Sequence, residues 1–437
     1  MFNKILGTFL SKGFVALISF GTLLLTTHNM GAQGRGDISI ITTVVGIMGL
    51  VNGFVGGGTL VYIMPRHKNR QFFTQAIFLS LLWASLVCVL GTALVRYGYQ
   101  IQTRNWEYVL YLGLLTCSYS ILLLMILSNE NINTYNVIGV VQPSLHFVFF
   151  AGAILLGYVG VSTFVFCLSL SYIFSLLIEI VIVKNIYSTI HTVAEKIRPI
   201  QTIKEMLSLG LMSQLGNVIQ YLNYRFSYFI INAYTGISAV GIYSVGISIA
   251  ESVWMLAQSI SLVQYSTIAN NENEDYAIAL TIKLAKLSFI ITLTIMSGIV
   301  LLPRFLFGLI FGNEFTQVRN AIIFLSPGIV ILSFGMILSH YFAGKGLYHI
   351  NTIASLIGLL ISIPGCFIMI PRFGYIGAAI VASVSYFMIV GYQLLIFLHK
   401  TNSNLEKFKI HYEDFNMIIE LFITVRESII NVYNKKL

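Results

Sequence analysis

One permanent cation lies inside a stretch of sequence, residues 206–232, that is apolar enough to cross a membrane. Arg225 shares one helical face with Gln214, Tyr221 and Asn232 when residues are placed at 100° intervals. A guanidinium near mid-membrane costs roughly 2.5–3.5 kcal/mol on insertion scales, so such a residue usually faces a watery cavity or a partner group. Because a guanidinium presents a planar fork of donors to phosphate and carboxylate oxygens, this face predicts an anion site.

A second polar face occurs in the next apolar stretch, residues 239–264. Ser244, Glu251 and Gln258 recur there at seven-residue intervals and share one side of a helix. Glu251 could pair with Arg225, since a depth difference of about 8 Å along the helices is within reach of an extended arginine. Arg225 is therefore interpreted either as a substrate contact or as half of a structural pair. Glu251, with Gln258 on the same face, is also the candidate for binding a coupling proton or sodium ion.

The composition identifies the kind of protein that carries these residues. Hydrophobic residues make up 57% of the 437, charged residues make up 9%, and the mean hydropathy is +0.85. Soluble domains carry about 25% charged residues, so this chain lacks the polar residues to coat a water-facing globule. Continuous apolar stretches of about 20 residues indicate helices rather than a barrel. The predicted spans are 7–27, 38–64, 74–95, 107–127, 134–156, 160–184, 206–232, 239–264, 283–303, 318–343, 349–370 and 374–398.

The distribution of Lys and Arg orients these spans. If the N-terminus lies in the cytoplasm, most of the 25 cations fall on the cytoplasmic side, which is the usual bias. The opposite side then carries Arg35, Arg96, Arg104, Arg304, Arg319 and Arg372. An even number of spans places both termini inside. The net charge of +9 follows mostly from this bias, and no nucleic-acid partner is predicted.

Two glycine-containing turns recur along the chain and predict an internal repeat. The turn GAQGRGDISI at 31–40 matches GISAVGIYSV at 236–245 in the positions of two glycines and a serine. The turn GYVGV at 157–161 matches GYIGA at 374–378 in the positions of two glycines and a tyrosine. Six spans separate the matched turns, so the two halves have the same orientation and are related by an axis along the membrane normal.

This symmetry predicts an all-α polytopic membrane protein with about twelve transmembrane helices in two parallel six-helix lobes around a central cavity. Residues 1–184 form the N-terminal lobe, residues 185–205 a basic cytoplasmic linker, and residues 206–398 the C-terminal lobe. Residues 399–437 form a cytoplasmic tail, whose apolar spacing predicts an amphipathic helix on the inner membrane surface. The plan is typical of a transporter.

Five longer motifs, spread over nearly the whole chain, carry a resemblance to a known family. They are MGAQGRGDISI at 30–40, YLNYRFSYFIINAYTGISAVGIYSVGISIAESVW at 221–254, LFGLIFGNEF at 306–315, HYFAGKGLYHINTIASLIGLLISI at 340–363 and MIPRFGYIGAAIVASVSYF at 369–387. Together they resemble the multidrug/oligosaccharidyl-lipid/polysaccharide (MOP) exporter superfamily, and within it the Wzx-type O-antigen and polysaccharide flippases. The chain departs from the Arg-x-Asp pattern that such proteins often carry, because Phe226 and Ser227 follow Arg225.

The resemblance implies a flippase that moves a lipid-linked oligosaccharide between leaflets by alternating access, in polysaccharide or O-antigen biosynthesis. The expected carrier is undecaprenyl pyrophosphate, the membrane is the bacterial cytoplasmic membrane, and Arg225 is expected to meet the pyrophosphate. Two other functions stay open: a small-molecule efflux antiporter of the same superfamily, and a membrane-embedded polysaccharide polymerase or glycosyltransferase. The basic interior disfavours the antiporter, and the short outer connections disfavour the enzyme.

Four further residues are candidates for substrate contact. Lys12 could meet the substrate at the inner leaflet, although snorkelling to the interface is the favoured interpretation, and Arg35 is more simply a solvated loop charge. Gln142 and His146, one helical turn apart, could line the cavity and donate to sugar hydroxyls, or could hydrogen-bond a neighbouring helix. Glu179, near the inner end of its span, is predicted to be an interfacial charge.

Motifs of enzymes and cofactor sites do not occur in the sequence. No zinc motif, phosphate loop or nucleophile–base order is present, so neither catalysis nor a cofactor is predicted. The four cysteines lack metal-ligand spacing and are expected in the core. GGG at 56–58 predicts a helix bend or close packing. Since no ATP-binding motif is present, the energy for transport would come from an H+ or Na+ gradient, the membrane potential or consumption of the product. Glycan-assembly enzymes are possible partners at the cytoplasmic tail.

Overall fold

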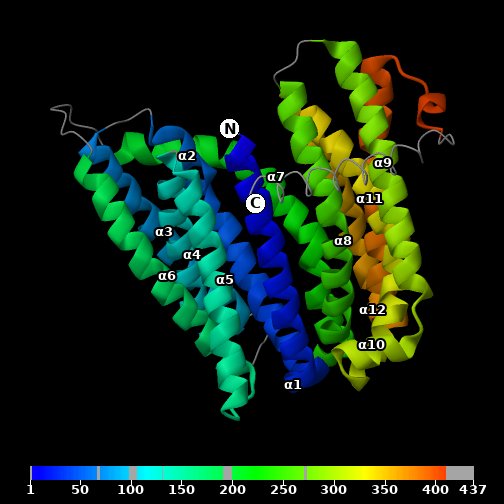
Figure 1. Ribbon diagram of the computed structural model, residues 1–437, viewed down its shortest axis with the longest axis horizontal. Helices are drawn as coiled ribbons and strands as arrows, with labels where there is room; N and C mark the ends of the chain where they lie inside the picture. Colours follow the sequence, from blue (N-terminus) through cyan, green and yellow to red (C-terminus); the bar gives the residue numbers. More distant parts are fainter. Residues whose placement is uncertain are drawn as a thin grey trace, which may run out of the picture. The chain divides into compact units, whose positions relative to one another are not determined.

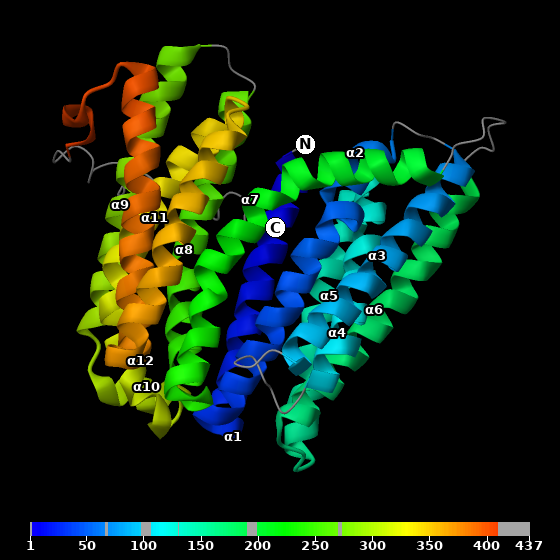
Figure 2. The same cartoon turned by 180° about the vertical axis from the view of Figure 1, so that it is seen from behind.

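The computed structural model describes most of the 437-residue chain. The described residues are 2–65, 69–97, 106–129, 131–189, 199–269 and 273–409. Every regular element in these residues is a helix (Figures 1 and 2). The elements are α1 (Phe2–Gly56), α2 (Gly58–Ile63), α3 (Arg70–Tyr97), α4 (Trp106–Ser128), α5 (Ile132–Leu155), α6 (Val161–Thr189), α7 (Pro199–Thr235), α8 (Ile237–Ala269), α9 (Glu274–Leu301), α10 (Arg304–Phe311), η1 (Asn313–Gln317), α11 (Val318–Gly344), α12 (Tyr348–Thr401) and η2 (Leu405–Phe408). The predicted all-α fold class is confirmed.

Nine helices among the described residues are long and apolar enough to cross a membrane. Two of them, α1 and α12, are of double length and bend at Gly31 and Gly374, so each contains two predicted spans. α7, with 37 residues, is also long enough, although its polar face interrupts its apolar stretch. Each predicted span thus corresponds to a helix or half-helix, except that the span 38–64 crosses the break between α1 and α2. The protein is a multi-pass membrane protein. The predicted amphipathic tail lies almost entirely beyond residue 409, outside the described residues.

The segments 31–40 and 374–378, which the sequence pattern predicts to be turns, are almost entirely helical. Only Gly31 (φ 64°) and Gly374 (φ 58°) leave helical geometry inside α1 and α12, and this left-handed region favours glycine. Arg35 therefore lies within α1 and is half-buried. Its prediction as a solvated loop charge is wrong, because a single glycine makes the whole bend and the helix resumes at once.

The internal repeat is visible in the backbone conformation of the matched turns. Gly31 and its match Gly236 have φ of 64° and 91°, and Gly157 and its match Gly374 have φ of 86° and 58°. The left-handed region is uncommon outside turns. Its recurrence at both members of both pairs supports the repeat inferred from sequence.

The matched segments of α1 and α8 also cross each other closely. A β-carbon on Gly36 would overlap the carbonyl oxygen of Ile237, and one on Gly241 would overlap that of Ala32. In the sequence match, Gly36 corresponds to Gly241 and Ala32 corresponds to Ile237. The two contacts are therefore equivalent, as a local two-fold axis through the crossing requires. The parallel repeat is therefore supported by packing as well as by sequence.

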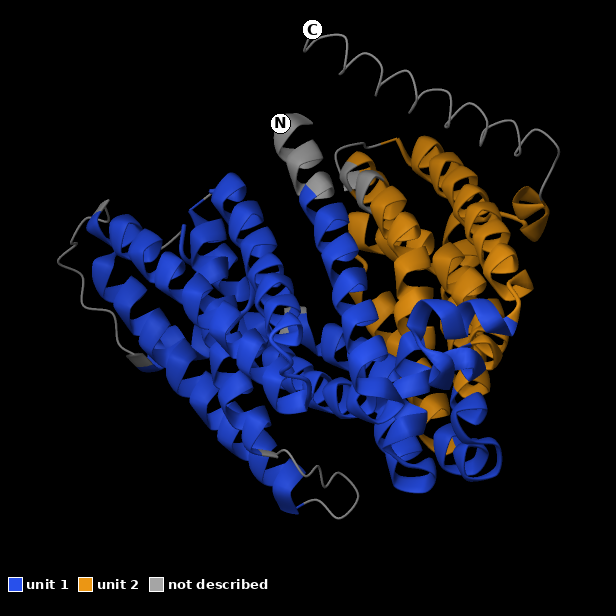
Figure 3. Ribbon diagram, turned by 60° about the horizontal axis from the view of Figure 1, so that its bottom comes forward, with its two compact units in different colours: residues 1–245, 304–318, 365–378 blue, residues 246–303, 319–364, 379–437 orange. Residues whose placement is uncertain are grey.

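The described helices group into two compact units (Figure 3). Unit 1 comprises residues 1–245, 304–318 and 365–378, and unit 2 comprises residues 246–303, 319–364 and 379–437. α7 belongs to unit 1 because it packs along α1. The six-helix lobes with boundaries at residues 184 and 206 stay a prediction.

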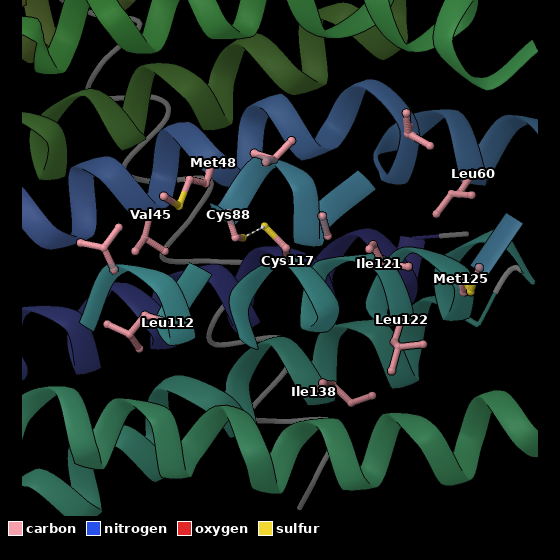
Figure 4. Close-up of a cluster of buried hydrophobic side chains, with 14 of the residues drawn as sticks. Val45, Met48, Leu60, Cys88, Leu112, Cys117, Ile121, Leu122, Met125 and Ile138 are labelled. Carbon is pink, nitrogen blue, oxygen red and sulfur yellow. Dashed lines mark hydrogen bonds between the residues drawn. The ribbon is translucent and has the colours of Figure 1, made fainter. Parts of the chain in front are cut away.

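The core of unit 1 is formed where α1, α3, α4 and α5 meet (Figure 4). Met48, Cys88, Cys117 and Ile138 are buried there, one from each of these helices. The Sγ atoms of Cys88 and Cys117 are 4.0 Å apart, and both thiols are free. All four cysteines are buried and free, which confirms their predicted place in the core.

Candidate functional site

α7 runs along the second half of α1, and glycines let the two helices approach closely. The carbonyl group of Phe54 occupies the place of a β-carbon at Gly210, and the phenol of Tyr221 fills the space beside Gly46. The Tyr221 hydroxyl also lies 3.5 Å from the carbonyl oxygen of Thr43, to which it donates. Small residues at such crossings are the usual basis of tight helix packing in membranes. The polar face of α7 is thereby fixed against α1.

Arg225 lies on this helix, half-buried, among tyrosine rings. Its Nη1 donates to the Tyr228 hydroxyl at 3.2 Å. Its guanidinium carbon is 5.3 Å from the ring centroid of Tyr228 and 6.0 Å from that of Tyr221. Tyr243 of α8 packs edge-on against Tyr228, with centroids 5.7 Å apart, and interacts electrostatically with Arg225. We call Arg225, Tyr221, Tyr228 and Tyr243 the arginine cluster.

These contacts are strong enough to hold the cation inside the helix bundle. Each cation–π contact contributes about 0.5–2 kcal/mol, depending on desolvation, and a hydrogen bond to a charged group about 1.5–3 kcal/mol. Together they are comparable to the roughly 2.5–3.5 kcal/mol that a buried guanidinium costs on insertion scales. Glu251 belongs to unit 2, and its pairing with Arg225 stays a prediction.

Four further polar residues on α7 form two local hydrogen bonds. Gln214 Oε1 accepts from Asn217 Nδ2 at 3.0 Å, and Gln220 Nε2 donates to the Tyr224 hydroxyl. Gln214 also packs on the break between α1 and α2, where a β-carbon on Gly53 would lie 3.2 Å from its Cδ. Because eleven residues correspond to about 16 Å along a helix, a ligand that touches both Gln214 and Arg225 must be extended.

The break that Gln214 contacts is the GGG sequence at 56–58. α1 ends at Gly56 and α2 begins at Gly58, because Gly57 has non-helical torsions (φ −97°, ψ −144°). The bend predicted for this sequence is confirmed.

Gln142 and His146 lie in the interface between α5 and α6. Gln142 Nε2 donates to Ser171 Oγ at 3.0 Å. The His146 ring lies edge-on to Phe164, with centroids 4.7 Å apart, and beside Phe150 at 6.1 Å. Gln142 was predicted either to line the cavity or to hydrogen-bond a neighbouring helix, and the structure shows the hydrogen bond to a neighbouring helix.

The other candidate residues are placed individually by the structure. Lys12 is exposed on α1. Gln258 is exposed on α8, two helical turns after the half-buried Glu251 on the same face. Neither residue is brought to the arginine cluster by a contact given for the described residues. Within residues that the structure describes, no three His, Cys, Asp or Glu side chains gather into a metal site.

Glu179 occupies a different environment from the interfacial one that its sequence position predicts. Its side chain is fully buried, on the face of α6 that packs against α4 and α5. The prediction is wrong because hydropathy along α6 shows the position of the residue in the span but not the direction of its side chain.

The bend in α1 contacts the segment formed by α10 and η1, and the sequence alone did not predict this contact. Glu314 Oε2 accepts a hydrogen bond from the backbone N–H of Ala32 at 2.7 Å, and His28 Nε2 lies 2.7 Å from the carbonyl oxygen of Ile310. The bend at Gly31 frees the first N–H groups of the following helix, and a carboxylate there is favoured by the helix dipole. The only sequence signal was that both motifs belong to the same family resemblance.

This helical architecture is shared with transporters of the MOP superfamily. The chain is similar to the structure of the lipid II flippase MurJ in an inward closed conformation, with 15% identity, 95% of this chain and 92% of that chain covered, and a TM-score of 0.75. It is also similar to an inward-facing multidrug resistance MATE family transporter of the MOP superfamily (15% identity, 89% and 94% covered, TM-score 0.67). A MOP superfamily transporter from Pyrococcus furiosus matches with 15% identity, 91% and 94% coverage and a TM-score of 0.60. At these identities the likeness shows the fold alone, which is that of a MOP transporter or flippase.

The family is shown by a separate match. A family model described as "Polysaccharide biosynthesis protein" matches residues 36–320, which is more than half of the chain. The protein therefore belongs to this polysaccharide biosynthesis family, as the motif resemblance predicted. No curated protein matches the sequence.

Proposed function

We propose that the protein is a flippase that moves a lipid-linked oligosaccharide, carried on a prenyl pyrophosphate such as undecaprenyl pyrophosphate, from the inner to the outer leaflet of the bacterial cytoplasmic membrane. Membership of the polysaccharide biosynthesis family supports the glycan part of this proposal. The fold shared with a lipid II flippase supports the translocation part. Translocation would proceed by alternating access.

The observation that carries the proposal is the arginine cluster. Arg225 Nη1 donates to a neutral phenol, the Tyr228 hydroxyl. A phosphate oxygen is an anionic acceptor that forms a shorter and stronger hydrogen bond, and the planar guanidinium can bind two such oxygens. An arriving pyrophosphate would therefore displace the phenol, while the tyrosine rings keep the cation in position.

The other candidate residues have proposed roles around this site. Glu251 would act as the counter-ion of Arg225 when the site is empty, so that phosphate and carboxylate compete for one guanidinium. Binding of a proton or, alternatively, of a sodium ion to Glu251, with Gln258 on the same helical face, would then link substrate binding to the gradient of that ion. Lys12 and Arg35 would attract the anionic head, and Gln214 would contact the sugars. For Gln142 and His146, the contacts with α6 favour the structural interpretation over a sugar contact.

The test is delivery of glycan in a deletion strain complemented with variants at matched membrane abundance. We expect Arg225→Ala to abolish surface glycan and to trap lipid-linked oligosaccharide on the inner leaflet, because the charged donor is lost. Arg225→Lys should retain part of the delivery, since the charge remains while the bidentate fork is lost. Arg96→Ala is the matched control, because Arg96 also lies over a tyrosine ring, that of Tyr97, but at the end of α3. Normal glycan with Arg225→Ala would overturn the role of Arg225.

A second candidate function is export of a small molecule, which the fold likeness to a MATE family transporter favours. This function predicts that deletion raises susceptibility to toxic compounds and leaves surface glycan unchanged. Outer-leaflet delivery at the wild-type rate in the deletion strain would remove the flippase proposal and leave the exporter.

A further inference from the structure

α6 carries its polar residues on the side that faces the interior of unit 1. Ser171, Ser175 and Glu179 follow one another at four-residue intervals, and each has 0% of its surface exposed. The opposite side exposes apolar residues, which are Ile173, Phe174, Leu177, Ile178, Ile180 and Val181. This pattern is the inverse of a helix in a soluble protein. It places an acidic residue inside the bundle of α4, α5 and α6, which lie side by side in Figures 1 and 2.

The Glu179 carboxyl group is surrounded by neutral groups. Neither of its oxygens has a hydrogen-bond partner among the described residues, and Ser175 Oγ, one turn earlier on the same face, also has none. Tyr119 of α4 interacts electrostatically with Glu179 and with the phenols of Tyr135 on α5 and Tyr172 on α6. The Tyr119 and Tyr172 rings pack edge-on, with centroids 5.3 Å apart. Among the described residues, the ionisable group that interacts with this carboxyl from a neighbouring helix is therefore a phenol, that of Tyr119.

The free-energy costs of burying Glu179 as a carboxylate and as a neutral carboxyl can be compared. An ionised carboxylate without a partner, taken out of water, costs at least several kcal/mol. A neutral carboxyl left without a hydrogen bond costs about 1–3 kcal/mol. No ion pair of Glu179 with Lys or Arg occurs in the part of the chain that the structure describes. Binding a proton is therefore the least costly way to keep Glu179 inside the bundle.

We propose that Glu179 is a proton-binding site of unit 1 and that its proton is released in another state of the transport cycle, which makes H+ the coupling ion. The proton forms an O–H bond with one carboxylate oxygen and leaves to bulk water. Ser175 Oγ, which has no hydrogen-bond partner among the described residues, is the donor that could stabilise the carboxylate after release. The Tyr119 hydroxyl, which donates to the Ile138 carbonyl oxygen at 3.5 Å, would have to exchange this long hydrogen bond for one to the carboxylate. Glu179 lies ten residues before the end of α6 at Thr189, so the path to water is about 15 Å along the helix. The coupling step rests on the proposed flippase function, whereas the proton site does not.

The proton site is tested by infrared spectroscopy of the purified full-length chain in lipid nanodiscs at neutral pH. We expect a carbonyl stretching band of a protonated carboxyl that disappears in Glu179→Gln and shifts in Glu179→Asp. Glu107→Gln is the matched control, because this exposed carboxyl at the start of α4 should leave the band unchanged. Absence of a Glu179 band at neutral pH would overturn the proton site. A carboxylate signal that instead changes when sodium replaces potassium would assign the site to a sodium ion and would equally overturn the proposal.

The coupling step is tested separately, in the deletion strain complemented at matched abundance. Glu179→Gln is fixed in the neutral form, so we expect delivery of glycan to slow on the order of tenfold and to become insensitive to a protonophore. Wild-type delivery with wild-type sensitivity would overturn the coupling, even if the infrared band is found. If deletion of the wild-type gene leaves glycan unchanged, the flippase proposal fails, and the infrared result still decides the proton site.

Discussion

Arg225 and Glu179 are both ionisable residues inside membrane-spanning helices, and the structure accommodates them in opposite ways. Arg225 is half-buried, and its charged group contacts tyrosine rings and donates to a phenol. Glu179 is fully buried without hydrogen-bond partners among the described residues. A guanidinium stays protonated in proteins, so its surroundings must adapt to the charge. A carboxyl can instead take up a proton, so its charge adapts to the surroundings.

The hydrogen bond between Arg225 and Tyr228 predicts a specific effect of Tyr228→Phe. The ring remains for the cation–π contact, but the empty site loses an acceptor worth about 1.5–3 kcal/mol. We expect a lower thermal midpoint of the purified protein without ligand and a larger rise of this midpoint on adding inorganic pyrophosphate, because the phenol no longer competes with phosphate. Tyr221→Phe is the control, since the Tyr221 hydroxyl faces the backbone of Thr43. Equal responses of wild type and Tyr228→Phe would contradict the competition.

The two residues also show what sequence can predict about a buried charge. The interior position of Arg225 could be predicted because neighbouring polar residues share its helical face, and a polar face against lipid is too costly. Glu179 has serines on its face at positions 171 and 175, and serine gives a much weaker signal because its small hydroxyl can bond to its own helix, as that of Ser171 does. Its burial depends on α4 and α5, which no local pattern in α6 specifies.

At the scale of helices, the bend in α1 depends on a residue from a distant part of the chain. Glu314 accepts from the N–H of Ala32 and faces the positive end of the helix that follows Gly31. We expect Glu314→Ala to destabilise unit 1 by about 1–3 kcal/mol, because a buried N–H then loses its partner. The measurement is thermal or denaturant unfolding in detergent. Glu107→Ala is the control, and an equal effect of the two variants would show that Glu314 does not cap α1.

The crossing of α1 and α8 predicts that two glycines act as a symmetric pair. Gly36→Ala and Gly241→Ala should each force the helices apart, because the added β-carbon overlaps a backbone carbonyl that cannot turn away. We expect both variants to lose most glycan delivery and to unfold at lower temperature. Gly49→Ala and Gly139→Ala are controls, since no atom lies within 4 Å of an added β-carbon there, and alanine stabilises a helix by about 0.5–1 kcal/mol over glycine. Similar behaviour of all four variants would contradict the close crossing.

The helices themselves could be predicted almost completely, whereas their junctions could not. In lipid every backbone polar group must be satisfied within the segment, so each apolar stretch of spanning length has to be a helix. Whether two such helices are separated by a loop or continue through one glycine depends on a single pair of torsions, as at Gly31 and Gly374. The contact between Ala32 and Glu314 joins residues 282 apart, and no local pattern predicts it.

At the scale of the whole molecule, large apolar side chains lie on the surface and many small polar side chains lie in the interior, which is the reverse of a soluble protein. Large apolar residues such as Leu94, Leu155 and Leu395 are 68–88% exposed, while serines, threonines and amides are buried. Lipid contact explains the exposed residues, and the close packing of small and polar residues explains the interior. The direction of transport that we propose depends on which end of the helices lies in the cytoplasm, and the distribution of Lys and Arg predicts that orientation.

Labelling of introduced cysteines tests this orientation in intact cells. Tyr158 lies in the exposed turn between α5 and α6, and Lys407 lies in the exposed segment after α12. If both termini are cytoplasmic, Tyr158→Cys should react with a membrane-impermeant maleimide added outside. Lys407→Cys should react only after the membrane is permeabilised. The native cysteines are buried, with at most 4% exposure, so the unmodified protein serves as the unlabelled control. Outside labelling of Lys407→Cys with protection of Tyr158→Cys would reverse the orientation and, with it, the proposed direction of transport.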